Sequence, residues 1–196
     1  GLIKSALNFS GVSSYIELHT SAFGFTKTTP FSGSAWVKTN VSSFHSIISN
    51  WRIVTSPGWN FFMGDFTTGK IGFGLNDADG SNYEGQEGAS VISDGRWHHV
   101  AFTYNGSNTP AGIKLYVDGL SQTLTERSGG TKEPGTLVDG SLEIGRRRYA
   151  TSPALFNGSI DEVKIFNRTL SATEIANEYQ MMSYGSTEKD NSGTPS

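Results

Sequence analysis

SDGRWHHVAFTYNGSNTPAGIKLYVDGLSQTL, residues 93–124, decides the fold because it reads as short strands separated by turn residues. Within it, residues 97–104 alternate between two faces with the period of two that a β-strand requires. One face is strongly apolar and consists of His98, Val100, Phe102 and Tyr104. We therefore expect a strand that lies against a core, with His98 as a buried, hydrogen-bonded core histidine.

The next strand ends in a hairpin. Residues 113–117 carry apolar side chains on one side, and Asp118-Gly119 is a residue pair that favours a two-residue type I′ turn. Such a turn predicts antiparallel pairing of the strands that it joins. The expected cross-strand pairs are Val117 with Leu120, Leu115 with Gln122, and Ile113 with Leu124.

Short strand patterns recur along the rest of the chain, and turn residues separate them. They fall at residues 5–9, 15–18, 31–39, 46–51, 59–63, 69–75, 142–144 and 163–165. Helical periodicity is almost absent, so the pattern predicts an all-β fold, a two-sheet antiparallel jelly-roll sandwich. The exception is Ser171-Ala172-Thr173-Glu174, a capping box that predicts one short C-terminal helix.

One domain accounts for most of the chain. A length of 196 residues is enough for a single full core, which we assign to residues 1–184. Residues 185–196 contain no apolar side chain to bury, so we expect a flexible tail or a linker there. The first four residues, Gly-Leu-Ile-Lys, have no signal-peptide pattern, and we expect a module cut from a longer chain.

The composition limits the partners of the domain. The formal net charge of -3 and the pI near 5.8 argue against nucleic acid as a partner. No apolar run reaches membrane-spanning length, so membrane insertion is not expected. The chain has no cysteine, which excludes disulfides and thiolate chemistry.

Several motifs carry a family resemblance. They are ALNFSGVSSYIEL (6–18), FSGSAWVKT (31–39), DGRWHHVAFTYNG (94–106), IKLYVDG (113–119), SLEIG (141–145) and FNGSIDEVKIFNRTLSATEI (156–175). In order and spacing they resemble the laminin-G-like, pentraxin-related branch of the concanavalin A-like lectin/glucanase jelly rolls. The resemblance implies the same sandwich, on which lectins, adhesion modules and enzymes are all found.

Aromatic residues in or beside the predicted loops are candidates for stacking on sugar rings, and polar neighbours can take the sugar hydroxyls. The candidate ligand-binding residues are Trp51, Trp59, Asp77, Asp79, Asn82, Tyr83, Arg146, Arg148 and Tyr149. The arginines suit carboxylated or sulfated sugars. Gly72 and Gly74 leave one strand face without side chains, which lets a ligand approach closely. The alternative is that these are ordinary solvated loop residues.

A calcium site is the second candidate. Asp161 shares a predicted strand face with Val163 and Ile165, so its carboxylate would be drawn toward the core and would need partners there. The resemblance implies a structural Ca²⁺ that joins this aspartate to the turn after the first strand. The expected ligands are Asp161, Ser10, Gly11 and Ser14. The alternative is a carboxylate that accepts backbone amides without a metal.

Catalysis is not expected. Glycosidases of this superfold carry two carboxylates on one strand face, as in Glu-x-Asp-x-x-Glu, and the sequence has no such run. We therefore expect a noncatalytic, calcium-stabilised recognition module that binds a glycan or glycoconjugate, in a secreted, cell-surface or virion protein. The alternatives are a structural or adhesion module that contacts other proteins of a filament, virion or surface assembly, and an atypical glycan hydrolase or lyase.

Overall fold

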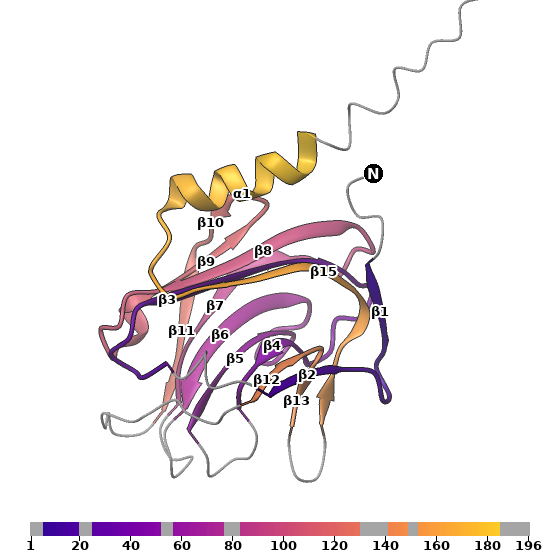
Figure 1. Ribbon diagram of the computed structural model, residues 1–196, viewed down its shortest axis with the longest axis horizontal. Helices are drawn as coiled ribbons and strands as arrows, with labels where there is room; N and C mark the ends of the chain where they lie inside the picture. Colours follow the sequence, from indigo (N-terminus) through magenta and orange to yellow (C-terminus); the bar gives the residue numbers. More distant parts are fainter. Residues whose placement is uncertain are drawn as a thin grey trace, which may run out of the picture.

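The computed structural model describes residues 6–19, 25–51, 57–76, 83–129, 141–148 and 153–184. Two antiparallel sheets pack face to face, which confirms the predicted sandwich (Figure 1). The six-stranded sheet has the order β1 (Leu7–Ser10), β15 (Asn157–Phe166), β3 (Phe31–Lys38), β8 (Trp97–Tyr104), β9 (Ile113–Val117) and β10 (Leu120–Ser121).

The second sheet has seven strands. Its order is β11 (Leu124–Gly129), β7 (Tyr83–Val91), β6 (Lys70–Asn76), β5 (Gly58–Met63), β4 (His45–Ser49), β12 (Ser141–Ile144) and β2 (Ile16–His19). A small third sheet pairs β13 (Arg146–Arg147) with β14 (Ala154–Leu155), and the helical segments are η2 (Pro110–Gly112) and α1 (Ala172–Tyr184).

An aromatic core fills the space between the two sheets. Phe73 of β6 and Phe102 of β8 stack across it, with ring centroids 4.0 Å apart and ring planes 15° from parallel. Trp59 belongs to the same core, since its side chain is 0% exposed and its ring lies 5.6 Å from that of Phe102. Full burial of a large apolar side chain stabilises the fold by about 1.5–3 kcal/mol, so these rings are major contributors.

The hairpin after β9 has the predicted turn. Val117 pairs with Leu120, and the N–H of Gln122 donates to the carbonyl of Leu115 at 2.9 Å. Asp118 has a φ of 51°, in the left-handed region that the type I′ turn requires. The first two expected pairs are therefore confirmed.

The third expected pair, Ile113 with Leu124, is wrong. After β10 the chain crosses to the other sheet, where Leu124 pairs with Gly88 of β7. The short β10 therefore leaves Leu120 on the surface, largely exposed. The crossing opens one side of the sandwich, between the last strands of the two sheets.

The two histidines of β8 lie on opposite faces, as their adjacency requires. The prediction that His98 is a buried core histidine is wrong, because its side chain is 16% exposed near the start of the strand. Its hydrogen bonds are confirmed: Nδ1 lies 2.8 Å from Asp118 Oδ2 and Nε2 lies 3.1 Å from Asp94 Oδ1. The buried histidine of β8 is His99, where burial lowers the pKa to about 4.

A β-bulge in β15 changes which residues face the core. Asp161 pairs with Trp36, but the pairing with β3 shifts immediately afterwards, and Glu162 has a φ of 49°. Consequently Ile160 and Val163 both pack on the core, although three positions separate them. The prediction that Asp161 shares the face of Val163 is wrong, because its register partner Trp36 faces α1.

The C-terminal helix begins with the predicted capping box. The Ser171 N–H donates to Glu174 Oε2 at 2.8 Å, and the Glu174 N–H donates to Ser171 Oγ at 3.2 Å. α1 lies on the outer face of the six-stranded sheet, where Tyr179 stacks on Trp36 with 5.8 Å between ring centroids (Figure 1). No helix within the described ranges is long and apolar enough to cross a membrane.

Candidate functional site

The outer face of the seven-stranded sheet is the candidate binding surface. α1 covers the six-stranded sheet, whereas no helix of the described chain lies over the other sheet (Figure 1). Side chains on this outer face are those that alternate with the core residues along each strand. Asn60 and Phe62 of β5, Gly72 of β6 and Glu87 of β7 follow this rule.

Phe62 occupies the space that Gly72 leaves open. A Cβ atom on Gly72 would lie 2.4 Å from the Cζ of Phe62, closer than any real contact. The aromatic ring therefore rests directly on the backbone of β6. At Gly72 the predicted approach of a ligand to a bare strand is wrong, because the chain's own ring is there.

Four aromatic rings and two guanidinium groups gather around this position. We name them the aromatic–arginine cluster: Phe44, Trp51, Phe62, Phe66, Arg127 and Arg147. The ring of Phe62 lies 5.8 Å from that of Phe44 and 6.2 Å from that of Phe66. The Arg127 guanidinium lies 5.2 Å from the centre of Phe66, and that of Arg147 lies 4.5 Å from Phe44 and 4.7 Å from Trp51. Phe66 is 46% exposed, so the cluster presents an aromatic ring to solvent.

Carboxylates balance the arginines of the cluster. Arg127 Nε lies 3.6 Å from Glu87 Oε2. Burial raises the pKa of Asp65, the Arg147 guanidinium opposes that rise, and the Glu87 carboxylate adds to it. The face thus combines hydrogen-bond donors and acceptors beside an exposed ring, which suits a ligand with many hydroxyl groups.

Asn60 supplies an unsatisfied donor on the same face. Its side chain is buried, and its Oδ1 accepts a hydrogen bond from Ser46 Oγ at 2.6 Å. Its Nδ2 has no hydrogen-bond partner among the described residues. Leaving a buried donor unpaired costs about 1–3 kcal/mol. Because the side chain is 0% exposed, this group is part of the packing beneath the face and does not contact a ligand at its surface.

Arg146 and Arg148 are engaged in ion pairs rather than presented to a ligand. Arg146 donates from Nε and Nη2 to the two oxygens of Glu143, at 2.8 and 2.6 Å, and its guanidinium lies 3.3 Å from the centre of the Tyr15 ring. Arg148 donates to Glu17 at 2.6 Å and lies 3.0 Å from Glu143. The geometry therefore gives these two side chains a structural role and does not favour the predicted contact with sugar.

The other predicted ligand-binding residues divide into three groups. Trp59 is in the core, so its predicted stacking on sugar is wrong. Trp51 is nearly buried and packs against Arg147, at the margin of the candidate face. The remaining positions lie outside the described residues, or have an undescribed side chain in the case of Tyr83: Asp77, Asp79, Asn82, Tyr83 and Tyr149.

Sequence reasoning missed Phe66 and Arg127. Phe66 lies in the segment Gly64-Asp65-Phe66-Thr67. A large apolar residue in such a polar turn is exposed to solvent, and exposed apolar side chains often mark binding sites. Arg127 gives no such signal, because only the pairing of β11 with β7 brings it to this face.

The predicted calcium donors lie on β1, on the turn after it and on β15. Ser10 pairs with Asn157, four residues before Asp161, which is a separation of about 13 Å along a strand. The Asp161 carboxylate accepts the N–H of the next residue at 2.8 Å, and Ser10 Oγ lies 3.1 Å from Ser14 Oγ. Gly11 has a φ of 72° and packs against Asn157. No group of three His, Asp or Glu side chains in the described ranges is placed to hold a metal ion. Calcium binding stays a prediction that melting with added Ca²⁺ and with EDTA tests.

Comparison with protein families identifies the fold family. The Laminin_G_3 model, described as the concanavalin A-like lectin/glucanases superfamily, matches residues 10–176. The chain belongs to this superfamily. Membership confirms the laminin-G-like resemblance of the strand motifs. Comparison with curated proteins gives no match.

Solved structures of the superfamily share the sandwich at low identity. Domains LG4-5 of the mouse laminin alpha1 chain match with a TM-score of 0.62 and 17% identity over 88% of this chain, which spans 44% of the laminin chain. The Ruminococcus gnavus IT-sialidase CBM40 matches with a TM-score of 0.67 and 14% identity, over 90% of this chain and 97% of that one. A SAP-like pentraxin from Limulus polyphemus matches with a TM-score of 0.59 and 14% identity, over 86% of this chain and 78% of the pentraxin chain. These likenesses show the fold alone.

Proposed function

We propose that this superfamily member is a noncatalytic module that recognises a glycan through the outer face of its seven-stranded sheet. The observation that carries the proposal is Phe66, whose half-exposed ring lies 5.2 Å from the guanidinium of Arg127. A flat apolar ring beside hydrogen-bond donors can stack on a sugar ring and bind its hydroxyls. A secreted or surface location is part of this proposal.

A solved structure of the same fold supports a glycan ligand. The CBM40 of the Ruminococcus gnavus IT-sialidase, at 15% identity and a TM-score of 0.67, was solved bound to alpha2,3 sialyllactose. A module with this sandwich can therefore hold a sugar, and arginines such as Arg127 and Arg147 suit an acidic one.

Glycan-array screening followed by calorimetry with the best oligosaccharide tests the proposal. We expect Phe66→Ala to weaken binding about tenfold, because it removes the exposed stacking surface. Arg127→Ala is expected to weaken the binding of acidic glycans more than the binding of neutral ones. The matched control is Met181→Ala, which removes an exposed apolar side chain from α1 on the other side of the sandwich. Equal affinities for all variants would reject the site.

A structural or adhesion module is the second candidate, and a group of exposed apolar side chains favours it. They lie on β1, β2 and the turn between them: Leu7, Val12, Tyr15 and Leu18. Failure to bind any glycan, together with self-association in light scattering, would favour this role.

The noncatalytic part of the proposal depends on Asp65 and Glu87. Both carboxylates lie near the cluster, and paired carboxylates are what glycosidases use. We expect a bound oligosaccharide to remain intact. Depolymerisation that Glu87→Gln removes would instead show an atypical hydrolase or lyase.

A further inference from the structure

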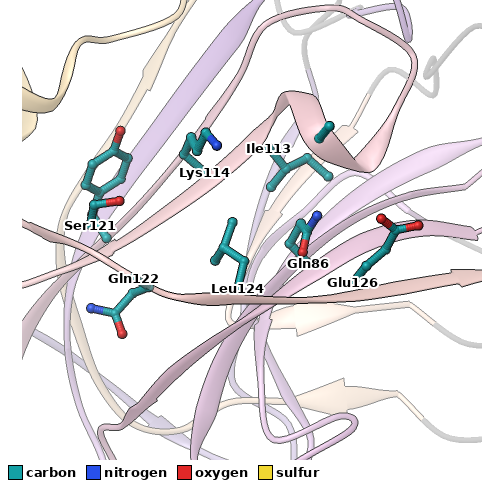
Figure 2. Close-up of a pocket in the computed structure, with 9 residues that line it drawn as sticks. Gln86, Ile113, Lys114, Ser121, Gln122, Leu124 and Glu126 are labelled. Atoms are coloured by element: carbon teal, nitrogen blue, oxygen red, sulfur yellow. The ribbon is translucent and has the colours of Figure 1, made fainter.

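A second groove lies at the open side of the sandwich, away from the aromatic–arginine cluster. It runs between β9 and β10 of one sheet and β7 and β11 of the other, and its volume is about 550 Å³ (Figure 2). Volumes of this size are typical of small-molecule sites. The lining residues are Gln86, Ala111, Ile113, Lys114, Tyr116, Ser121, Gln122, Leu124 and Glu126.

The inner face of the seven-stranded sheet becomes polar where it meets this groove. On β6 the inward positions are Ile71, Phe73 and Leu75, all fully buried. On the next strand Gln86 pairs with Phe73, and on β11 Glu126 pairs with Gln86, so both face the same way. An inward row of polar side chains is unfavourable unless something polar meets it.

Gln86 places an unpaired acceptor at the wall of the groove. Its side chain is 7% exposed, and its Nε2 donates to the carbonyl of Pro110 at 3.1 Å. Its Oε1 has no hydrogen-bond partner among the described residues. Figure 2 shows the amide between Ile113 and Glu126, at the wall of the groove. Because buried acceptors are almost always satisfied, this oxygen calls for a donor from the groove.

The walls of the groove supply hydrogen-bond acceptors to a ligand, and their charged side chains sum to zero. Lys114 contributes one positive charge and Glu126 one negative charge. Leu115 turns its carbonyl toward β10, where it accepts the N–H of Gln122, so the carbonyl of Ile113, two residues earlier, also points to this edge. Ser121 adds an exposed hydroxyl.

Gln122 gives the groove a rigid side. Its Oε1 accepts the N–H of Ser90 at 3.1 Å, and its Nε2 donates to the carbonyl of Leu120 at 3.2 Å. Beside it, Leu124 and Ile113 supply apolar surface. A preorganised wall with alternating polar and apolar patches matches the alternating hydroxyl and C–H surfaces of a sugar.

We propose that this edge groove is a second binding site, for a neutral saccharide, separate from the outer face. A saccharide hydroxyl donates to Gln86 Oε1 while the sugar ring lies on Leu124 and Ile113. An anionic ligand would meet the Glu126 carboxylate, and a purely apolar one would leave Gln86 Oε1 unsatisfied. The inference deepens the proposed function and rests on it for the ligand class only.

The test is an NMR titration. Neutral and sialylated oligosaccharides are added to the isotope-labelled chain, and its amide signals are monitored. We expect neutral oligosaccharides to shift the amide signals of Gln86, Lys114 and Leu124 in a saturable way. Ser121→Trp, which plugs the groove from an exposed position, should abolish those shifts. Asn177→Trp, at an exposed position of α1, is the matched control and should leave them unchanged.

Two further variants make the result decisive. Gln86→Leu should weaken binding of the neutral saccharide about tenfold, because it removes the acceptor. Thermal melting checks that the Gln86→Leu variant is folded. Phe66→Ala should leave the groove signals shifting as before, so failure of the outer-face site and failure of the groove are distinguishable. The proposal is overturned if no neutral saccharide shifts the groove signals, if only peptides or anionic sugars do, or if Ser121→Trp has no effect.

Discussion

His98 shows how two neighbouring carboxylates determine the behaviour of one side chain. Burial alone would lower the pKa of His98, but hydrogen bonds and charges from Asp118 and Asp94 outweigh it, and the pKa is raised above its ordinary value of 6.5. Asp118 belongs to the type I′ turn and also accepts the N–H of His99 at 2.9 Å. The imidazolium therefore fastens the hairpin turn to the start of β8.

The raised pKa of His98 makes stability depend on pH. A histidine whose pKa is higher in the folded state stabilises that state fully below pH 6.5, and the contribution is lost as pH rises through the folded pKa. His45 and His99, whose pKa values burial lowers to about 4, have the opposite effect over this range, so the test is a difference between proteins. In urea titrations at about pH 6 and about pH 8, we expect the stability advantage of the parent over His98→Gln to shrink as pH rises. His19→Gln, at an exposed position, is the control, and an advantage over His98→Gln that is equal at both pH values would contradict the prediction.

Local patterns predicted some single residues well and others badly. Asp118 and the Ser171–Glu174 box were predictable because turn and cap chemistry depend on a few adjacent residues. Trp59 was not, because the preceding Thr-Ser-Pro-Gly sequence indicates a loop, whereas the strand already begins at Gly58. Arg146 was misassigned because one of its carboxylate partners, Glu17, is more than a hundred residues away in sequence.

The bulge in β15 is the element that most affects which side chains face the core. One extra residue at Asp161–Glu162 lets Ile160 pack inward on one side of it and Val163 on the other. Alternation alone cannot reveal such an insertion, since the sequence on each side obeys the same period of two. The strand was therefore predictable, and the face of Asp161 was not.

Deleting Glu162 tests the role of the bulge. Without the extra residue, one part of β15 must turn its apolar side chains outward, so we expect loss of cooperative folding in thermal melts. The matched variant Glu162→Gly keeps the residue count and relieves a φ of 49°, so it should fold and be more stable by up to about 1 kcal/mol. A deletion variant that melts like the parent would show that the bulge is dispensable.

The ion pairs of Arg146 and Arg148 join β2 to β12 and β13, which lie more than a hundred residues further along the chain. Glu143 is almost fully buried and Arg146 is 11% exposed, whereas Arg148 is 34% exposed. Breaking a buried pair leaves an uncompensated charge, so Arg146→Met should cost about 3–5 kcal/mol. Arg148→Met should cost about 1 kcal/mol or less. Urea titration measures both, and equal losses would contradict the assignment.

The two proposed sites use different parts of the same sandwich, and they were predictable to different degrees. The sandwich was predictable from the strand motifs, because these identify the superfamily. The position of the aromatic–arginine cluster was not, since Phe44, Phe66 and Arg127 meet only through strand pairing across the seven-stranded sheet. The edge groove depends on the crossing of the chain after β10, which the hairpin pattern alone did not indicate.

The position of β15 between β1 and β3 has a consequence for how the protein is made. Leu7 pairs with Ile160, so β1 has no neighbour in its sheet until β15 has left the ribosome. Contacts between residues so far apart in sequence are slow to form. The nascent chain must therefore keep one edge of β3 unpaired while the intervening strands are made, and the six-stranded sheet can be completed only after translation has passed residue 166.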